Sequence, residues 1–584
     1  MGLIPEEKIL EIKEATDIVD IVSNYVSLKK TGVNFKGLCP FHVEKTPSFI
    51  VSPTKQIFHC FGCGVGGNVF HFVSKIENIN FIDAVKFLAN KNGIKLTYSD
   101  EKSSLKEDIY KVNDLACKFF KEKLFSREGE VAREYLKKRN IDKGTIDKFL
   151  LGFAPDDWDG FYNFAKKQGF SDYLLLQAGL IIKREKTEGY YDRFRNRLIF
   201  PIVNNLGRVC AFGGRVLDNS LPKYINSPES PVYVKGKNLY GWYFAKDSII
   251  KENKAIIVEG YFDCITCHKF GITNVVATLG TSLTKDQVQN IRKYTNNAII
   301  AYDIDTAGIN ASIRGLDLLI EEGIDVKISI LEGEKDPDEY LNKNGKEAFL
   351  TCINNSKEII DFWLDVSKKE RVADLKGKLK LVQEMLPVVA KVQDDNKRLE
   401  YRRLISDRLN IPEMYISKEL DRILRKVYKI DLKEKKESKT LSIYEIAEKE
   451  LLKLILSDTT IARRVREKVV PSDFSNLVYA KLLEVVFNYL DENKEIGNLD
   501  ISGLLDEDLI KVYTEIILER KEYEDKAKAA NDLIKVIKEN SLKKRLIELE
   551  KEVKKLGKEK VDKKLVEEYL QLQRYLKRNS NVLR

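Results

Sequence analysis

Two short pairs of potential metal ligands constrain the fold of this chain more than any other feature of its sequence. The first pair is Cys39-x2-His42, the second is Cys60-x2-Cys63, and 17 residues separate His42 from Cys60. Two pairs with this spacing are typical of a tetrahedral Cys3His zinc site. Because four protein ligands leave no coordination position open, the sequence predicts a zinc ribbon with one structural zinc. Buried free cysteines are the alternative interpretation.

The remaining cysteines and histidines are interpreted as packing or surface residues. His59 and His71 lack the spacing of ligands. Cys264-x2-Cys267-His268 matches a haem-attachment pattern, but it lies in a predicted helix, and such haems are attached outside the cytoplasm. The start of the chain does not resemble a signal peptide, and no run reaches about 18 apolar residues. We therefore expect a cytoplasmic protein with no membrane segment.

Strand-like and helix-like runs alternate between residues 254 and 340. Apolar runs typical of buried strands cover 255–260, 274–280, 297–305 and 326–331, and helical patterns lie between them. Strands that alternate with helices form βαβ units and a parallel sheet. The sequence therefore predicts an α/β domain here.

Acidic residues follow several of these predicted strands. Because open parallel sheets bind ligands at the carboxyl ends of their strands, we expect these carboxylates to gather at one edge. Oxygen ligands suit Mg²⁺, and two such ions, about 4 Å apart, would activate a 3′-hydroxyl and stabilise a leaving pyrophosphate. Solvated loop carboxylates are the alternative interpretation. The residues concerned are Glu259, Asp263, Asp303, Asp305, Asp336 and Asp338.

A basic segment precedes this acidic one. Residues 183–246 hold 12 Lys and Arg against 5 Asp and Glu, whereas residues 254–340 hold 8 against 14. Arg193, Arg195 and Arg197 alternate, and in a strand they would project from one face about 7 Å apart, close to a single-strand phosphate repeat. Phe194, Phe212 and Tyr224 are candidates for base stacking. An ordinary solvated basic face is the alternative.

The sequence predicts a multidomain α+β protein. Its parts are a zinc ribbon, a basic α/β subdomain, an α/β domain with a parallel sheet, a helical subdomain and an all-α C-terminal domain. Polar or charged stretches at 99–108 and 431–440 are interpreted as linkers. The predicted boundaries are 1–98, 109–250, 251–345, 346–430 and 441–584.

Three sets of motifs together resemble the bacterial DNA primase family. The Cys39, His42, Cys60 and Cys63 set is similar to its zinc ribbon. The runs RFRNRLIFPI (193–202), FGGR (212–215) and PKYINSPES (222–230) are similar to its basic polymerase subdomain. VEGYFD (258–263), AYDIDTAG (301–308) and KDPDEY (335–340) are similar to its Toprim domain. The order of the motifs is that of the family. One departure is Ile304, where the family often has glycine.

The resemblance implies a DNA-dependent RNA polymerase, a nucleotidyltransferase that makes short RNA primers de novo on single-stranded DNA. It implies Glu259, Asp303 and Asp305 as catalytic residues, and these three with Asp263, Asp336 and Asp338 as the site for Mg²⁺ or Mn²⁺. It also implies contacts to template or nucleotide from Arg193, Arg195, Arg215, Lys223, Tyr224, Asn226 and Lys235, which Arg197 would join if the alternating arginines form one basic face.

The resemblance also implies partners. These are the single-stranded template, ribonucleoside triphosphates and the replicative hexameric helicase, which residues 441–584 would bind; single-strand-binding protein is a further candidate, and the enzyme is expected to be a monomer. Two alternatives stay open. Topoisomerases also contain Toprim domains, but they need a nucleophilic tyrosine and form a covalent DNA adduct. A non-catalytic DNA-binding adaptor would have no use for clustered carboxylates.

Overall fold

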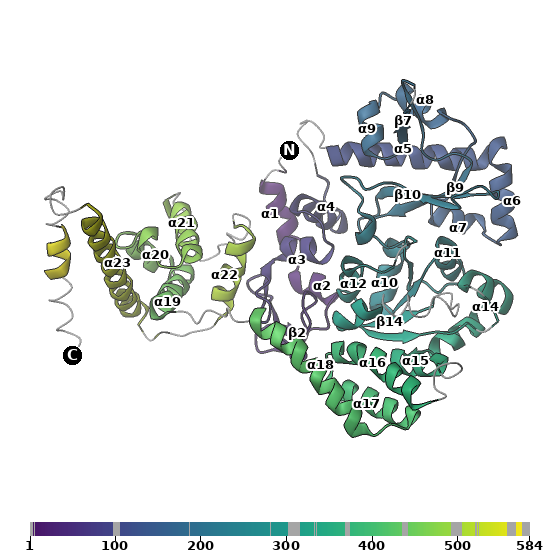
Figure 1. Ribbon diagram of the computed structural model, residues 1–584. Helices are drawn as coiled ribbons and strands as arrows, with labels where there is room; N and C mark the ends of the chain where they lie inside the picture. The colour runs from purple at the N-terminus through teal and green to yellow at the C-terminus, as the bar shows by residue number, and fades with distance from the viewer. Residues whose placement is uncertain are drawn as a thin grey trace. The chain divides into compact units, whose positions relative to one another are not determined.

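The computed structural model forms two compact units, residues 1–9 with 95–434 and residues 10–94 with 435–584. Figure 1 shows the elements of both units. The described part of the chain comprises residues 4, 6–96, 105–185, 187–280, 282–301, 316–331, 333–334, 336–367, 374–434, 442–491, 505–519, 523, 525–556 and 568–574.

The amino-terminal part of the second unit is an antiparallel sheet between short helices. Its strands are ordered β1-β2-β3-β4-β5. A cluster of phenylalanines forms its core, in which the rings of Phe49 and Phe58 stack at 5.3 Å and Phe72 packs edge-on against Phe58. The elements are α1 (Glu6–Glu14), which begins in the first unit, α2 (Ile18–Ser23), β1 (Lys29–Thr31), β2 (Asn34–Gly37), β3 (Phe49–Ser52), β4 (Ile57–Cys60), β5 (Gly66–Asn68), α3 (Val69–Ile76) and α4 (Phe81–Lys91).

The carboxyl-terminal part of this unit is helical and has a hydrophobic core of its own. Leu451, Leu483 and Val486 are fully buried in that core. Ser442 caps the first helix in a capping box with Glu445, which is a strong helix start signal. The elements are α19 (Ile443–Ser457), α20 (Thr459–Arg466), the 3-10 turn η3 (Pro471–Asp473), α21 (Leu477–Asp491), α22 (Glu507–Leu518) and α23 (Lys526–Leu556).

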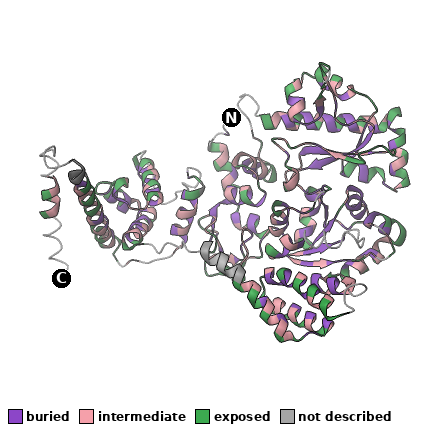
Figure 2. Ribbon diagram, viewed as in Figure 1, coloured by how far each residue is buried: buried purple, intermediate pink, exposed green. Residues whose placement is uncertain are grey.

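The first unit begins with the basic subdomain, whose sheet has the order β11-β10-β9-β6. Strands β9 and β10 are almost entirely buried, and α5 packs along them (Figures 1 and 2). The elements are α5 (Leu105–Phe125), η1 (Arg127–Gly129), α6 (Glu130–Lys138), α7 (Lys143–Lys148), β6 (Gly152–Ala154), α8 (Gly160–Lys167), α9 (Asp172–Gln177), β7 (Ile181–Lys183), β8 (Tyr190–Asp192), β9 (Arg197–Val203), β10 (Val209–Val216), β11 (Tyr224–Asn226), η2 (Lys235–Lys237) and α10 (Trp242–Glu252).

The predicted parallel sheet follows. Strands β12, β13, β14 and β15 pair in parallel in the order β13-β12-β14-β15, and the short strand β16 adds an antiparallel edge. The sheet is therefore mixed rather than purely parallel. Its elements are β12 (Ala255–Val258), α11 (Tyr261–Lys269), β13 (Val275–Ala277), α12 (Lys285–Arg292), β14 (Asn297–Ile300), β15 (Asp325–Ile328), α14 (Pro337–Asn354) and β16 (Lys357–Glu358).

One hydrophobic core joins the basic subdomain to the parallel-sheet domain. It contains residues from β9 and β10 together with residues from β12, α11 and α14. Tyr261 lies at the boundary, where its ring stacks on Phe200 at 4.7 Å and meets Tyr240 edge-on at 4.6 Å. Gly213 permits this approach, because a Cβ at that position would clash with the Tyr261 hydroxyl.

Helices complete the first unit and correct both predicted linkers. They are α15 (Ile359–Ser367), α16 (Leu375–Lys391), α17 (Asp395–Leu409) and α18 (Glu413–Glu434). Helix α5 already begins at Leu105 and α18 continues to Glu434, so part of each predicted linker is helical. The residues concerned are mostly Leu, Lys and Glu, which favour helix. Residues 99–104 and 435–440 lie outside the described residues.

Candidate active site and metal centres

The four predicted zinc ligands converge on one point. Cys39 and His42 follow β2, Cys60 ends β4, and Cys63 lies in the turn before β5. Their ligand atoms all lie within 4.8 Å of one another. Cys39 Sγ is 3.8 Å from Cys63 Sγ, and Cys60 Sγ is 3.6 Å from His42 Nδ1. Three sulfurs and one imidazole nitrogen at these separations suit tetrahedral zinc.

Neighbouring groups hold these ligands in place. Glu44 lies 3.3 Å from His42 Nε2 and accepts hydrogen bonds from the backbone N–H groups of Cys39 and Ser48. A carboxylate on the second ring nitrogen of a ligand histidine fixes its orientation and tautomer. Ser48 Oγ lies 3.2 Å from Cys60 Sγ, so the residues bound by Glu44 also contact a thiol of the set.

Gly62 is required by the close packing around the zinc ligands. A Cβ on Gly62 would lie 2.5 Å from His42 Nε2 and 2.8 Å from Ser48 Oγ. Any side chain here would therefore push His42 out of position.

Most of the other cysteines and histidines that were interpreted as packing or surface residues lie in the core, whereas His71 is half-buried, with its Nδ1 2.7 Å from Asn68 Oδ1. Cys264 and Cys267 are fully buried in α11, and His59 is buried on β4. His268 is also buried, with Nε2 2.9 Å from the Val275 carbonyl and Nδ1 3.2 Å from Lys148 Nζ. The interpretation of the Cys264–His268 pattern as helix packing is confirmed.

Two of the predicted carboxylates flank the turn from β12 into α11. Glu259 follows β12 directly and is exposed. Asp263, in the first turn of α11, is buried and accepts a hydrogen bond from the Gly260 backbone N–H at 2.9 Å. Asp263 thus satisfies a backbone N–H at the amino end of α11, directly after Glu259. This contact gives a structural reason for the aspartate at the end of the VEGYFD run.

Two more lie at the start of α14. Asp336 is the N-cap of this helix and accepts a hydrogen bond from the Glu339 N–H at 2.8 Å. Asp338 is buried, and its backbone N–H lies 3.4 Å from Asp263 Oδ1. Buried polar groups thus connect the starts of α11 and α14, although Asp263 and Asp338 are 75 positions apart in the chain.

Asp303, Asp305 and Ile304 fall in 302–315, outside the described residues. Within the described ranges, the zinc set is the group of three or more potential ligands whose ligand atoms converge. The assembly of one metal site stays a prediction for the whole set, Glu259, Asp263, Asp303, Asp305, Asp336 and Asp338.

The prediction of three alternating arginines on one strand is wrong. Strand β9 begins at Arg197, and Asn196 before it has a left-handed φ of 48°. Arg197 is buried and donates to the carbonyl of Pro222 at 3.0 Å. Arg195 instead lies over the ring of Trp158, 4.2 Å from its centroid. Burial lowers the pKa of Arg193 and of Arg197.

The aromatic residues proposed to stack bases differ in exposure. Phe194 and Phe212 are buried in the core of the basic subdomain, where both rings pack near Phe120. Their prediction as stacking platforms is therefore wrong. Tyr224 is 38% exposed and remains a candidate.

The other basic-segment residues surround β11. The Arg215 guanidinium lies 4.7 Å from the Tyr135 ring centroid, and its Nε and Nη1 atoms are buried without a hydrogen-bond partner. Asn226 joins the two domains, because it accepts a hydrogen bond from Tyr261 and donates one to the Leu279 carbonyl. Lys223 is exposed on the turn before β11, and Lys235 begins η2.

The sequence interpretation missed Arg139. This residue follows α6, far from the basic segment, yet its guanidinium is paired with Asp338 and lies 4.4 Å from the Phe262 ring centroid. Its Nε donates to the Tyr135 hydroxyl at 2.6 Å. No local pattern in the sequence pairs Arg139 with Asp338, because the two residues are 199 positions apart.

Comparison with known proteins identifies the family. Residues 4–104 match the CHC2 zinc finger, 119–246 the DNA primase catalytic core, N-terminal domain, 256–341 the Toprim-like family, and 364–413 the DnaB-helicase binding domain of primase. A DNA primase of Clostridium acetobutylicum is 40% identical over 502 residues, which cover 84% of this chain and 83% of the relative. The chain belongs to the bacterial DNA primases.

Further similar proteins carry the same name. A DNA primase of Halalkalibacterium halodurans is 38% identical over 555 residues, covering 91% of this chain and 92% of the relative. A crystal structure of the Aquifex aeolicus primase, comprising zinc-binding and RNA polymerase domains, covers 70% of this chain and 98% of its own at 37% identity, with a TM-score of 0.49.

Family membership confirms several predictions. The chain is a DNA primase, an RNA polymerase and nucleotidyltransferase, with a zinc finger and a Toprim domain, the latter implying catalysis with divalent metal. The topoisomerase and adaptor alternatives are set aside. The primase also contains a helicase-binding segment, matched at 364–413. In the described ranges, none of its helices is both long enough and apolar enough to cross a bilayer.

Proposed function

We propose that this primase synthesises short RNA primers de novo on single-stranded DNA, with catalysis at the edge of the parallel sheet where β12 ends. Glu259, Asp303, Asp305 and Asp336 would hold two Mg²⁺ or Mn²⁺ ions, with Asp263 in support. Such ions lower the pKa of a bound hydroxyl and neutralise charge on a leaving pyrophosphate. The observation that carries the proposal is the placement of Glu259 and Asp336 next to helix starts beyond parallel strands.

The chain's own residues would bind and orient the substrates. Arg215 is suited to phosphate, because no carboxylate of the described residues is paired with its guanidinium group and Tyr135 supports its face. Tyr224, exposed beside it, offers a surface for a base. Lys223, Lys235 and the exposed parts of Arg193 and Arg195 would contact the template backbone. Arg197 donates to a backbone carbonyl and Asn226 accepts from the Tyr261 hydroxyl, so these two residues would hold the template-binding residues in place.

Further parts of the proposal concern the rest of the molecule. We place one structural zinc per chain at Cys39, His42, Cys60 and Cys63, and the enzyme in the cytoplasm as a monomer. The domain ranges predicted from the sequence remain our assignment, apart from the helical parts of the two linkers. The hexameric helicase would bind residues 441–584, and single-strand-binding protein is a candidate partner. The helicase assignment is supported by the separate hydrophobic core of these helices and by the exposure of Ile443 and Leu477.

A direct experiment tests the catalytic proposal. Ribonucleotide incorporation is measured on single-stranded DNA without any primer, with and without Mg²⁺. We expect synthesis only with metal, and none from Asp303→Ala or Asp305→Ala. Because these substitutions also remove negative charge near the template, binding of single-stranded DNA should be unchanged or tighter. Synthesis at the wild-type rate by these variants would show that the metal assignment is wrong.

A further inference from the structure

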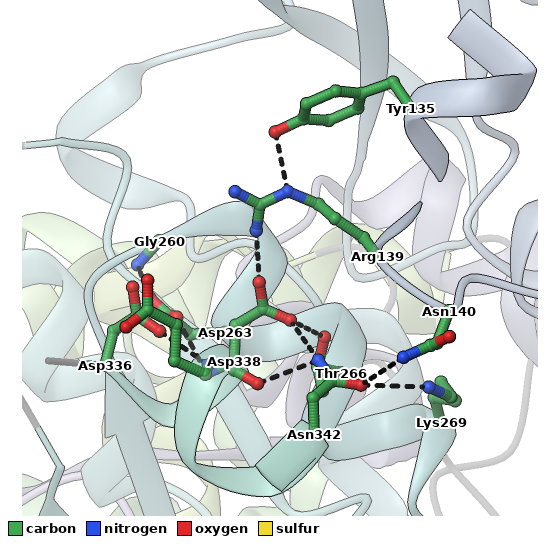
Figure 3. Close-up of polar contacts among 11 residues, drawn as sticks. Tyr135, Arg139, Asn140, Gly260, Asp263, Thr266, Lys269, Asp336, Asp338 and Asn342 are labelled. Atoms are coloured by element: carbon green, nitrogen blue, oxygen red, sulfur yellow. Dashed lines mark hydrogen bonds and ion pairs between the residues drawn. The ribbon is translucent and has the colours of Figure 1, made fainter. Parts of the chain in front are cut away.

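Three protein groups bind the carboxylate of Asp338. Its Oδ1 accepts hydrogen bonds from Thr266 Oγ1 at 2.6 Å and from Asn342 Nδ2 at 3.0 Å, and its Oδ2 is paired with Arg139 Nη1 (Figure 3). The side chain is only 5% exposed. A carboxylate has about four acceptor positions, and three are filled here. A metal ion at this carboxylate would also lie beside the positively charged Arg139 guanidinium, which would repel it.

The Arg139 side chain is held by two further residues besides Asp338. Its Nε donates to the Tyr135 hydroxyl at 2.6 Å, and its face lies 4.4 Å from the Phe262 ring centroid. Arg139 follows α6 in the basic subdomain, whereas Asp338 and Thr266 belong to the parallel-sheet domain. The ion pair therefore connects the two domains at the edge of the candidate active site.

Asp336, two residues earlier, has different surroundings. It is half-buried, and the hydrogen bond that the structure gives its carboxylate comes from the backbone of Glu339. No ion pair involves it among the described residues. The two aspartates of this motif thus differ in whether a cation of the protein already neutralises them.

Arg139 also belongs to the surroundings of Arg215. Tyr135 and Phe262 contact both guanidinium groups, with Arg215 at 4.7 Å and 5.6 Å from their ring centroids. A displacement of Arg139 would therefore be expected to move the two aromatic rings that support Arg215. Because Asp338 holds Arg139, a change at Asp338 would also affect the position of Arg215.

We propose that Asp338 is a positioning residue, not a metal ligand: it fixes Arg139, and through Tyr135 and Phe262 it sets the position of Arg215 relative to the metal site. Asp336 alone supplies the metal ligand of this motif. The inference rests on the proposed function, because it gives Asp338 a role beside the proposed metal site rather than in it.

Metal binding by the full chain separates the two roles. Binding of Mn²⁺ is followed by electron paramagnetic resonance in Asp338→Asn and in the matched variant Asp336→Asn. Asparagine keeps the volume of Asp338 and an oxygen for Thr266, but it lacks the charge that pairs with Arg139. We expect the Kd for Mn²⁺ to rise by about tenfold or more in Asp336→Asn and to stay within about threefold in Asp338→Asn.

Nucleotide kinetics test the positioning role. We expect Asp338→Asn and Arg139→Gln each to raise the KM for ribonucleotide by about tenfold while kcat changes less than about threefold. The double variant should be no worse than the more affected single variant, because both changes break one ion pair. A smaller fraction of folded protein alone would lower kcat and leave KM unchanged. Lys269→Gln, at the edge of the same cluster, should match the wild type.

The outcomes that overturn the proposal are definite. A tenfold weaker Mn²⁺ binding in Asp338→Asn, KM effects that multiply in the double variant, or an unchanged KM in both single variants would each do so. Glu259→Gln tests the proposed metal site independently. If it leaves Mn²⁺ binding unchanged, that site is wrong, whereas the KM comparison still decides whether Asp338 acts through Arg139.

Discussion

The role of each basic side chain depends on what its charged group already binds. Arg197 and Arg215 both lie in the basic segment beside apolar strand residues, but one donates to backbone carbonyls and the other keeps two unpartnered nitrogen atoms. A buried guanidinium on carbonyls stabilises the fold, whereas an unsatisfied one is suited to a ligand. Charge counts along the chain cannot make this distinction, because the groups around each arginine come from distant parts of the sequence.

Salt dependence tests whether Arg193 and Arg195 touch the template. Removing one phosphate contact should lower the salt slope of single-strand binding by about 0.7, so the double change to alanine should lower it by about 1.4. The measurement is binding of a fluorescent oligonucleotide across salt concentrations. Arg197→Ala serves as the comparison, and there we expect a lower midpoint of thermal unfolding. An unaltered salt slope in the double variant would show that Arg193 and Arg195 do not contact the template and belong to an ordinary solvated basic face.

The zinc site makes a prediction at the same scale. Because such sites supply roughly 10–16 kcal/mol of apparent binding free energy, Cys60→Ser should release the metal and unfold the ribbon locally. Gly62→Ala should weaken zinc binding, since the added methyl group meets His42. Elemental analysis of purified protein is the measurement, with Cys352→Ser as a control that keeps one zinc per chain. A wild-type chain without zinc would contradict the assignment.

At the scale of elements, α11 shows how a helix can carry both the active-site edge and the core. Its first turn holds Asp263 and follows Glu259, while its last turn buries His268 against Val275 and Lys148. Burial lowers the pKa of His268 from 6.5 to about 4. The imidazole is therefore neutral in the folded enzyme at neutral pH.

This shift predicts how stability depends on pH. The unfolded chain takes up a proton on His268 below pH 6.5, whereas the folded chain resists it until about pH 4. The contribution of this residue to stability is thus complete above pH 6.5 and declines as the pH falls, by up to about 3 kcal/mol. His268→Gln keeps a donor for the Val275 carbonyl but has no titrating group. The free energy of unfolding, measured with urea, should therefore depend less on pH in this variant than in the wild type between pH 4 and 6.5. The same pH dependence in the variant and the wild type would contradict the prediction.

The elements and sites that could be predicted from the sequence are those marked by a pattern of neighbouring residues. The parallel strands were found because strands buried on both faces are continuous apolar runs, such as 255–258 and 297–300. The zinc ligands were found because their spacing is local. The alternating arginines failed because Asn196 turns the chain just before β9, and the Arg139 pair was missed because it joins residues 199 positions apart. No periodicity encodes such a contact.

At the scale of the whole molecule, two segments are candidates for the helicase contact. The matched helicase-binding segment is 364–413, which comprises the end of α15, all of α16 and α17, and the first residue of α18, whereas our proposal concerns 441–584. The two lie in different compact units. Truncation between them therefore distinguishes the segments.

A chain that ends at Glu434 should still make primers on bare single-stranded DNA, because the metal and basic residues lie before that point. If 441–584 bind the helicase, this truncated chain should neither bind the helicase stably nor be stimulated by it. Pull-down with purified helicase and primer synthesis with and without it are the measurements. Full helicase binding by the truncated chain would assign the contact to 364–413 instead. An insoluble truncated chain would show that the last helices complete the fold.

The core shared around Tyr261 has a consequence for recombination between relatives. Because Phe200 and Tyr240 from one domain pack against Tyr261 from the other, neither half has a complete interior alone. Calorimetry should record a single cooperative transition for residues 105–354. In a chimaera that exchanges only the parallel-sheet half between two primases, the buried residues of the basic subdomain would face the buried residues of a different primase across this boundary. Such exchanges will succeed only when the residues on both sides of that boundary are transferred together.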